Sequence, residues 1–292
     1  MFILAVIHAF FDAKDNRTQR FLMIITLFVY GFLLEYMGVM TGNYHYASEA
    51  IMLFDVIPLS VTFSWVGIIY SVMLIGDLLN LPAWLRIITS TLIALSLDWG
   101  MDPIAVNLGA WTWTYEGVYF GVPGFNFIGW FFIPIAYLLP YELNWNTQSK
   151  KLQLLTIKQV DSYRTWARKL YTLFIVVPIA AGILILVGII SRIPFLYNLD
   201  LLIIIIWIIL TVSISTGMIY WKQKNLRRKN WYDIIPPIIL VLLVINFTFF
   251  GFLIGRYDLA ALMLVISIPL WSILGFTLVK NYDNVDINRK SN

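Results

Sequence analysis

The stretch LLIIIIWIILTVSISTGMIYW, residues 201–221, decides the fold class, because it contains no Asp, Glu, Lys, Arg or His. Three further windows of the same length, 170–190, 234–254 and 259–279, are equally free of these residues. About 20 apolar residues are needed to cross a bilayer core of about 30 Å as a helix. Four such windows, in a chain that is 60% hydrophobic and 12% charged, predict a polytopic helical membrane protein.

Four less uniform apolar segments lie in the first half of the chain, near 21–42, 52–76, 86–106 and 124–141. Together with the four uncharged windows they predict eight membrane spans, or nine if residues 1–11 also cross. We therefore expect an all-α transmembrane bundle in the lipid bilayer of the cell membrane, with many passes through it.

The basic residues are sorted by membrane side. If each span crosses once, every Lys and Arg except Arg192 and Arg256 falls on one side. They lie at Arg86 and in the segments 12–20, 142–169, 222–233 and 280–292. Because cytoplasmic loops carry an excess of Lys and Arg, this side and the C-terminus are predicted to be cytoplasmic. The loops 43–50 and 105–123 then face outward.

The chain reads as one membrane domain, because no linker composition marks a boundary. We divide it into a motif-bearing half at 1–141, a basic cytoplasmic loop at 142–169, a plain helical half at 170–279 and a polar tail at 280–292. The formal charge of +4 is explained by the sorting of basic residues, so no nucleic-acid partner is expected. There are no cysteines and only two histidines, so we expect no metal and no cofactor.

Three acidic residues interrupt the apolar spans of the first half: Glu35, Asp98 and Asp102. The four uncharged windows, which all lie in the second half, contain none. A carboxylate in hydrocarbon is costly to hold, so an acid inside a span is a candidate for function. By the predicted orientation all three lie in the outward half of their spans. We predict that the catalytic chemistry resides in these three residues.

Glu35 shares one helix face with three glycines, at the spacing i, i+4, i+7 and i+11: Gly31, Glu35, Gly38 and Gly42. Small residues on a membrane helix let a neighbouring helix approach closely, so Glu35 is predicted to point into the protein and not at lipid. One interpretation is a protonated Glu that hydrogen-bonds across helices. The other is a group that faces substrate.

Asp98 and Asp102 are four residues apart and so share a helix face. Two carboxylates this close cannot both ionise easily in a low dielectric, and one of them is expected to keep its proton and to be able to donate it. Alternatively, Asp102 only ends a helix before Pro103, at the membrane interface.

Aromatic residues and glycines crowd the stretch 105–130 on the predicted outward side. Among the aromatic residues are Trp111, Trp113, Tyr119 and Trp130, and Tyr44 and Tyr46 add two more from the preceding outward loop. An interfacial aromatic belt is one interpretation. The glycines and Pro123 instead favour a shaped, re-entrant or lid-like loop, whose aromatic faces would suit a long apolar ligand and a positive charge developing on it.

Three motif blocks stand out within residues 1–140. They are E-x-x-G-V-x-T-G-x-Y-x-Y from Glu35 to Tyr46, D-x-x-x-D-P from Asp98 to Pro103, and a glycine- and tryptophan-rich block from Gly109 to Trp130 that includes Tyr119 and Asn126. These blocks resemble the carotenoid-biosynthesis membrane family that includes carotenoid hydratases of the bisanhydrobacterioruberin and γ-carotene type. The second half is similar to this family only as generic membrane helices.

The resemblance implies a hydro-lyase that adds water across the terminal double bond of an acyclic carotenoid. It implies catalytic roles for Glu35, Asp98 and Asp102. The implied substrate contacts are Tyr44, Tyr46, Trp111, Trp113, Tyr119, Asn126 and Trp130. Other carotenoid-pathway enzymes are candidate partners.

Three other functions remain open at this point. The acids could form the proton relay of an isoprenoid or lipid transporter or flippase. The protein could bind a carotenoid without changing it. It could also be a carotenoid cyclase, which begins with the same protonation but excludes water.

Overall fold

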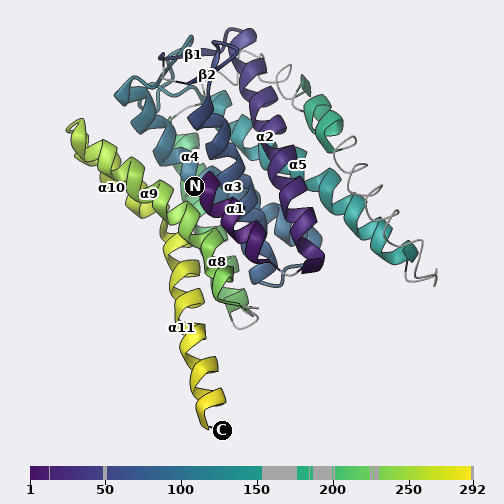
Figure 1. The fold of residues 1–292 in the computed structure, drawn as a ribbon. Coiled ribbons are helices and arrows are strands. Elements are labelled where there is room, and N and C mark those ends of the chain that lie inside the picture. Colours follow the sequence, from purple (N-terminus) through teal and green to yellow (C-terminus); the bar gives the residue numbers. More distant parts are fainter. Residues whose placement is uncertain are drawn as a thin grey trace.

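The computed structural model describes residues 1–12, 14–48, 51–152, 176–183, 185–186, 199, 201–223, 226 and 230–290. Over these residues the chain forms a bundle of helices with short strands at one end (Figure 1). The predicted basic loop beyond residue 152 and most of the predicted span 170–190 lie outside the described residues.

The helices and strands follow the apolar segments of the sequence. The helices are α1 (Phe2–Phe11), α2 (Lys14–Met40), α3 (Leu59–Leu78), α4 (Ala83–Leu108), α5 (Gly124–Leu152), α8 (Leu201–Lys222), η2 (Trp231–Ile234), α9 (Ile235–Leu253), α10 (Tyr257–Ile266) and α11 (Ile268–Lys290). The strands are β1 (Tyr44–Tyr46), β2 (Met52–Leu53), β3 (Ile57–Pro58) and β4 (Trp111–Trp113). Strand β1 pairs antiparallel with β4, and β2 with β3.

Five described helices are long and apolar enough to cross a membrane, or six if α10 and α11 form one bent span. The expected class, an all-α bundle of apolar helices, is confirmed, whereas the expected count of eight or nine spans is not reached among the described residues. Helix α1 has only 10 residues. The window 259–279, predicted as one span, is bent by 51° between α10 and α11.

Several predicted boundaries also differ from the structure: α2 begins at Lys14 and not near 21, and α5 continues to Leu152, into the predicted loop 142–169. The segment 52–76 was expected to be helical throughout, but its first residues form β2 and β3, and α3 begins only at Leu59. Pro58, which cannot donate a backbone hydrogen bond, stands at the turn from strand to helix. The predicted loop 105–123 begins later, because α4 continues to Leu108, where Gly109 ends the helix in the left-handed conformation with φ of +77°.

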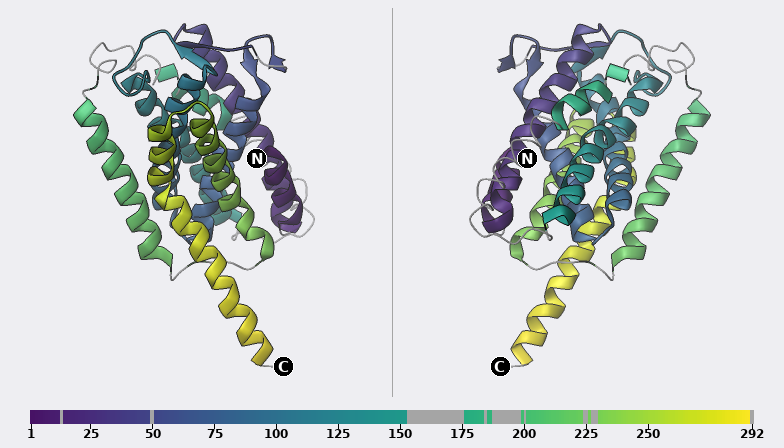
Figure 2. Two further views of the ribbon diagram at one scale, coloured as in Figure 1. Left: turned by 90° about the vertical axis from the view of Figure 1, so that its left-hand side faces the viewer. Right: turned by 90° about the vertical axis from the view of Figure 1, so that its right-hand side faces the viewer.

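Helix α4 lies at the centre of the bundle. All of its residues from Thr89 to Ala105 are buried, and it packs against α3, α5, α8, α9 and α10. Helix α8, which is almost purely apolar, stands at the periphery in Figure 2 and exposes most of its side chains. The helix that carries Asp98 and Asp102 is therefore the one that its neighbours shield from lipid, so the two carboxyls face protein rather than hydrocarbon.

A network of charged residues ties the helix ends at the opposite end from the sheets. Arg20 on α2 contacts Asp12 at 2.7 Å and Asp77 on α3 at 3.4 Å. Arg86 on α4 contacts Asp77 at 2.5 Å and Glu142 on α5 at 3.1 Å. Four helices are thus joined at the end where the sequence placed its basic residues.

Replacing Arg86 with Met should lower the free energy of unfolding by about 2–3 kcal/mol, because Asp77 loses one of its two cationic partners and the buried Glu142 loses its contact. The matched control is Arg256→Met, which removes the more exposed pair with Asp258 and should cost less than about 1 kcal/mol. Thermal unfolding of both variants in detergent measures the difference. Equal stability of the two variants would contradict a role for this network.

Candidate functional site

Glycines on α2 set the position of two aromatic side chains beside Glu35. A methyl group at Gly31 would lie 2.7 Å from Cβ of Trp65 on α3, and one at Gly38 would overlap the phenol of Tyr44. The predicted glycine face therefore does allow close approach, by one neighbouring helix and by strand β1. The absence of side chains at Gly31 and Gly38 leaves room for Trp65 and Tyr44 to reach the carboxyl of Glu35, which lies between the two glycines.

Glu35 is buried and receives three hydrogen bonds. Tyr44 donates its hydroxyl to Oε2 at 2.6 Å, Tyr46 donates to the same oxygen, and Trp65 Nε1 donates to Oε1. Burial, and then the neighbouring carboxyl, raise the pKa of Tyr44 and Tyr46 well above the ordinary value of a phenol, so both keep their protons. Trp65 can only donate and the two hydroxyls can each donate, so the three contacts suit an ionised carboxylate.

Asp98 and Asp102 form a second acidic group, joined by one amide. Asn126 on α5 donates through Nδ2 to Oδ2 of Asp98 at 2.8 Å and to Oδ2 of Asp102 at 2.7 Å. Trp111 on β4 donates to Oδ1 of Asp102 at 2.7 Å. Oδ1 of Asp98 is buried and has no hydrogen-bond partner among the described residues.

The β1–β4 sheet carries donors for both acidic groups. In the pairing register Tyr44 lies opposite Trp113 and Tyr46 opposite Trp111. Strand β1 thus supplies the hydroxyls for Glu35, and strand β4 the indole for Asp102. The two loops that the sequence placed on the outward side meet in this sheet.

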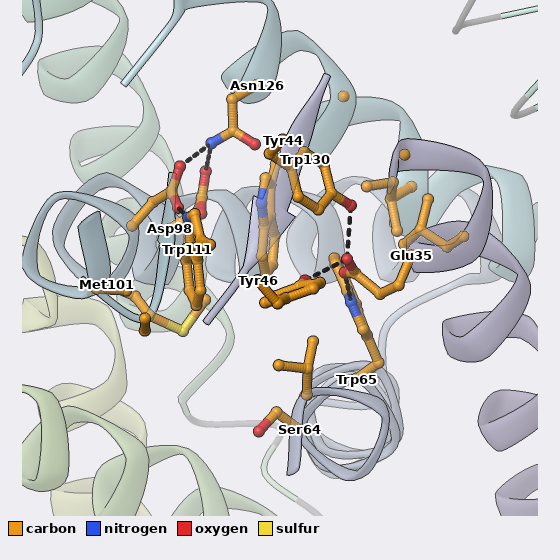
Figure 3. Close-up of a pocket in the computed structure, with 18 of the residues that line it drawn as sticks. Glu35, Tyr44, Tyr46, Ser64, Trp65, Asp98, Met101, Trp111, Asn126 and Trp130 are labelled. Carbon is orange, nitrogen blue, oxygen red and sulfur yellow. Dashed lines mark hydrogen bonds between the residues drawn. The ribbon is translucent and has the colours of Figure 1, made fainter. Parts of the chain in front are cut away.

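The two acidic groups face one pocket of about 670 Å³. Figure 3 shows Glu35 on one side and Asp98 on the other, with aromatic side chains between them. Trp65 stacks on Trp130 with ring centroids 4.3 Å apart. The pocket therefore combines carboxyl groups with flat aromatic walls, and can hold an apolar group next to an acid.

Most of the residues predicted for the site line this pocket. They are Glu35, Asp98, Asp102, Tyr44, Tyr46, Trp111, Trp113, Asn126 and Trp130. Tyr119 is elsewhere: its hydroxyl donates to the backbone carbonyl of Trp99 at 2.8 Å, and its ring packs on Trp99 and Phe127. Tyr119 therefore braces α4 from the loop and does not face the pocket.

Several lining residues were missed at the level of sequence. Trp65, the third donor to Glu35, lies on α3 six residues after the start of that helix, and no pattern in the sequence marks it as part of the site. Helix α9, in the half expected to be plain, lines the pocket with Leu243, Asn246, Phe247 and Phe250. Among the described residues, no three His, Cys, Asp or Glu side chains gather in a way that could hold a metal ion.

The family model described as carotenoid biosynthesis protein matches residues 1–191, which is about two thirds of the chain. The chain belongs to the carotenoid biosynthesis protein family. The match contains α1 to α5 and so both acidic groups of the pocket, whereas the α9 wall lies beyond the matched residues. No curated protein and no solved structure matches this member of the family.

Gly38→Ala should displace Tyr44 and remove its hydrogen bond to Glu35, because the added methyl would overlap the phenol ring. The expected loss is about 1–3 kcal/mol of stability, since a buried carboxyl loses a donor. Gly275→Ala on α11, where nothing lies within 4 Å of the added methyl, is the matched control and should be neutral or slightly stabilising. Thermal unfolding of both variants gives the comparison, and equal midpoints would contradict the close packing at Gly38.

Proposed function

We propose that the protein is a carotenoid hydratase, a hydro-lyase that adds water to the terminal double bond of an acyclic carotenoid. The observation that carries the proposal is the buried Oδ1 of Asp98, which has no partner among the described residues and belongs to a side chain that lines an aromatic pocket. Membership in the carotenoid biosynthesis family supports the substrate class.

The reaction needs three steps, and water is the only reactant besides the carotenoid. A carboxylic acid transfers its proton to the less substituted carbon of the terminal alkene, which leaves a tertiary carbocation and a carboxylate. Water then adds to the cation through its oxygen. The resulting oxonium loses a proton to a carboxylate, which restores the acid and leaves a tertiary alcohol.

The hydrogen bonds favour Asp98 as the proton donor. Glu35 accepts from three donors and Asp102 has both oxygens occupied by N–H groups, so each is arranged as an anion. Asp98 has one oxygen bound by Asn126 and the other free to carry a proton. Asp102, held four residues away, disfavours a second negative charge and thereby favours the protonated form of Asp98.

Glu35 and the aromatic walls suit the cation that follows. The fixed carboxylate across the pocket stabilises positive charge by electrostatic attraction in a site with little water. Trp65 and Trp130, which stack on each other and line the pocket, can add cation–π attraction through their outer ring faces. Glu35 also provides an acceptor that can orient the attacking water.

The first test is pigment analysis in a bacterial host that accumulates lycopene or a longer acyclic carotenoid, with and without this gene. A more polar product, heavier by one water, is expected. An isomer of unchanged mass would indicate that the protein is a cyclase and not a hydratase. Unchanged pigment, with the protein present in the membrane, would contradict hydration of that substrate, and co-purification of the pigment would then favour a binding or transport function.

Replacing the acids separates their roles. Asp98→Asn should lower hydration by about 100-fold or more, since it removes the proton donor while keeping the shape of the side chain. Asp102→Asn and Glu35→Gln should also lower turnover, because each removes a fixed negative charge beside the reaction. Asp258→Asn, an exposed acid outside the pocket, is the control and should keep wild-type turnover. Full activity in all three pocket variants, measured at equal amounts of protein in the membrane, would refute the mechanism.

A further inference from the structure

The pocket has an edge that the proposed chemistry does not use, between α3 and α9. Ser60, Val61 and Ser64 line it from α3, and Asn246 and Phe247 line it from α9. Ser60 and Asn246 are exposed, although both belong to the pocket lining. We call this edge of the pocket, which residues of both helices line, the α3–α9 mouth.

The mouth lies at the depth of the acids. Ser64 is five residues after the start of α3, Asn246 seven residues before the end of α9, and Glu35 five residues before the end of α2. At a rise of about 1.5 Å per residue, these positions are roughly 8–10 Å from the helix ends. The α9 end belongs to the same face as the sheets, because Arg256, just beyond it, bonds Asn107 near the end of α4.

The mouth borders the surface that faces lipid. Ile245, next to Asn246, and Phe249, three residues further along α9, are exposed large apolar residues that do not line the pocket. Together with Leu242 and Leu253 they form the kind of apolar face that contacts acyl chains. The α3–α9 edge of the pocket therefore lies next to a surface that suits acyl chains.

Asn246 is the unusual residue of the mouth. Ser64 satisfies its hydroxyl on the carbonyl of Ser60 at 2.9 Å, as serines in membrane helices commonly do. The amide of Asn246 makes no hydrogen bond to another described residue, although it is exposed midway along an apolar helix. An unpaired amide at this depth is costly, which makes it a candidate for ligand contact.

We propose that the α3–α9 mouth is a binding site for the hydrocarbon chain of the carotenoid, which extends through it from the pocket into the bilayer. An all-trans conjugated chain is rigid and cannot fold back inside the pocket, so an end group placed beside Asp98 must have its remaining chain outside. The apolar flanks Val61 and Phe247 suit that chain. This site rests on the proposed function for its ligand, but not on the reaction taking place.

Asn246 then has a role as the product withdraws. The hydrated end carries a tertiary hydroxyl, which must pass the mouth on its way to lipid, whereas the unreacted end is purely hydrocarbon. An amide can donate to and accept from that hydroxyl. Asn246 is thus a contact that discriminates the product end from the substrate end.

The test uses the absence of cysteine from the whole sequence. Single variants Ser64→Cys and Asn246→Cys are labelled with an apolar methanethiosulfonate reagent in membranes that contain or lack lycopene, and Ile245→Cys serves as the matched lipid-facing control. Lycopene should slow labelling at the two mouth positions by about tenfold, and leave the control unchanged, because a bound chain covers the thiol. Equal labelling with and without lycopene at both mouth positions would overturn the proposal.

The same variants separate this site from the reaction. Labelled Ser64→Cys should lose hydration relative to its unlabelled form and regain it when a reductant removes the label, while labelled Ile245→Cys should not change. Protection by lycopene in a protein that makes no hydrated product would uphold the mouth and refute the hydratase. Hydrated product formed at an undiminished rate by fully labelled Ser64→Cys would uphold the hydratase and refute the mouth as the binding site.

The role of Asn246 has its own readout. Protein purified from a pigmented host should carry a lower ratio of hydrated to unreacted carotenoid when Asn246 is replaced by Leu, and the ratio should be restored in part by Asn246→Gln. A ratio that is the same in Asn246→Leu and the wild type would remove Asn246 from the binding site.

Discussion

The cost of holding carboxyl groups inside a membrane governs this structure. Asp98 and Asp102 would be strongly unfavourable on a helix that faced lipid, and α4 is instead enclosed by five other helices. The apolar α8 can take the outer position because it has no charged group to shield before its terminal Lys222. The order of the helices, from centre to edge, thus follows where the charges are. Helix α4 is not among the helices apolar enough to count as membrane spans, because its polar residues lower its hydropathy. The same polar residues favour its position in the middle of the bundle.

Much of this was readable in the sequence, and the reasons are physical. Uncharged windows such as 201–221 have few alternatives to a membrane helix, and the helical spacing of Gly31, Glu35 and Gly38 fixed the face that packs. The i, i+4 spacing of Asp98 and Asp102 placed both in one pocket. The glycine- and tryptophan-rich stretch, expected to be a shaped loop, does form one, with β4 and the bridges between Gly117 and Gly121 and between Tyr119 and Val122.

Other features depend on contacts between distant segments, which no local pattern encodes. The pairing of Tyr46 with Trp111 joins loops 65 positions apart, and Asn126 reaches Asp98 from a different helix. Tyr119 resembles its aromatic neighbours in composition but turns toward the backbone of α4. The contribution of α9 to the pocket also could not be predicted, because Asn246 is a single amide in an apolar run. Its place in the pocket lining depends on the packing of α9 beside α3.

The two-stranded sheet has a mechanical consequence. Tyr46 holds Glu35, and its cross-strand partner Trp111 holds Asp102, so the two acidic groups are linked by a ladder whose strands lie about 4.8 Å apart. Helices in a bilayer tilt when its thickness changes, but the spacing between paired strands is set by their backbone hydrogen bonds and changes little. The sheet therefore keeps the two acidic groups at a constant separation while the bundle around it adjusts to different lipids.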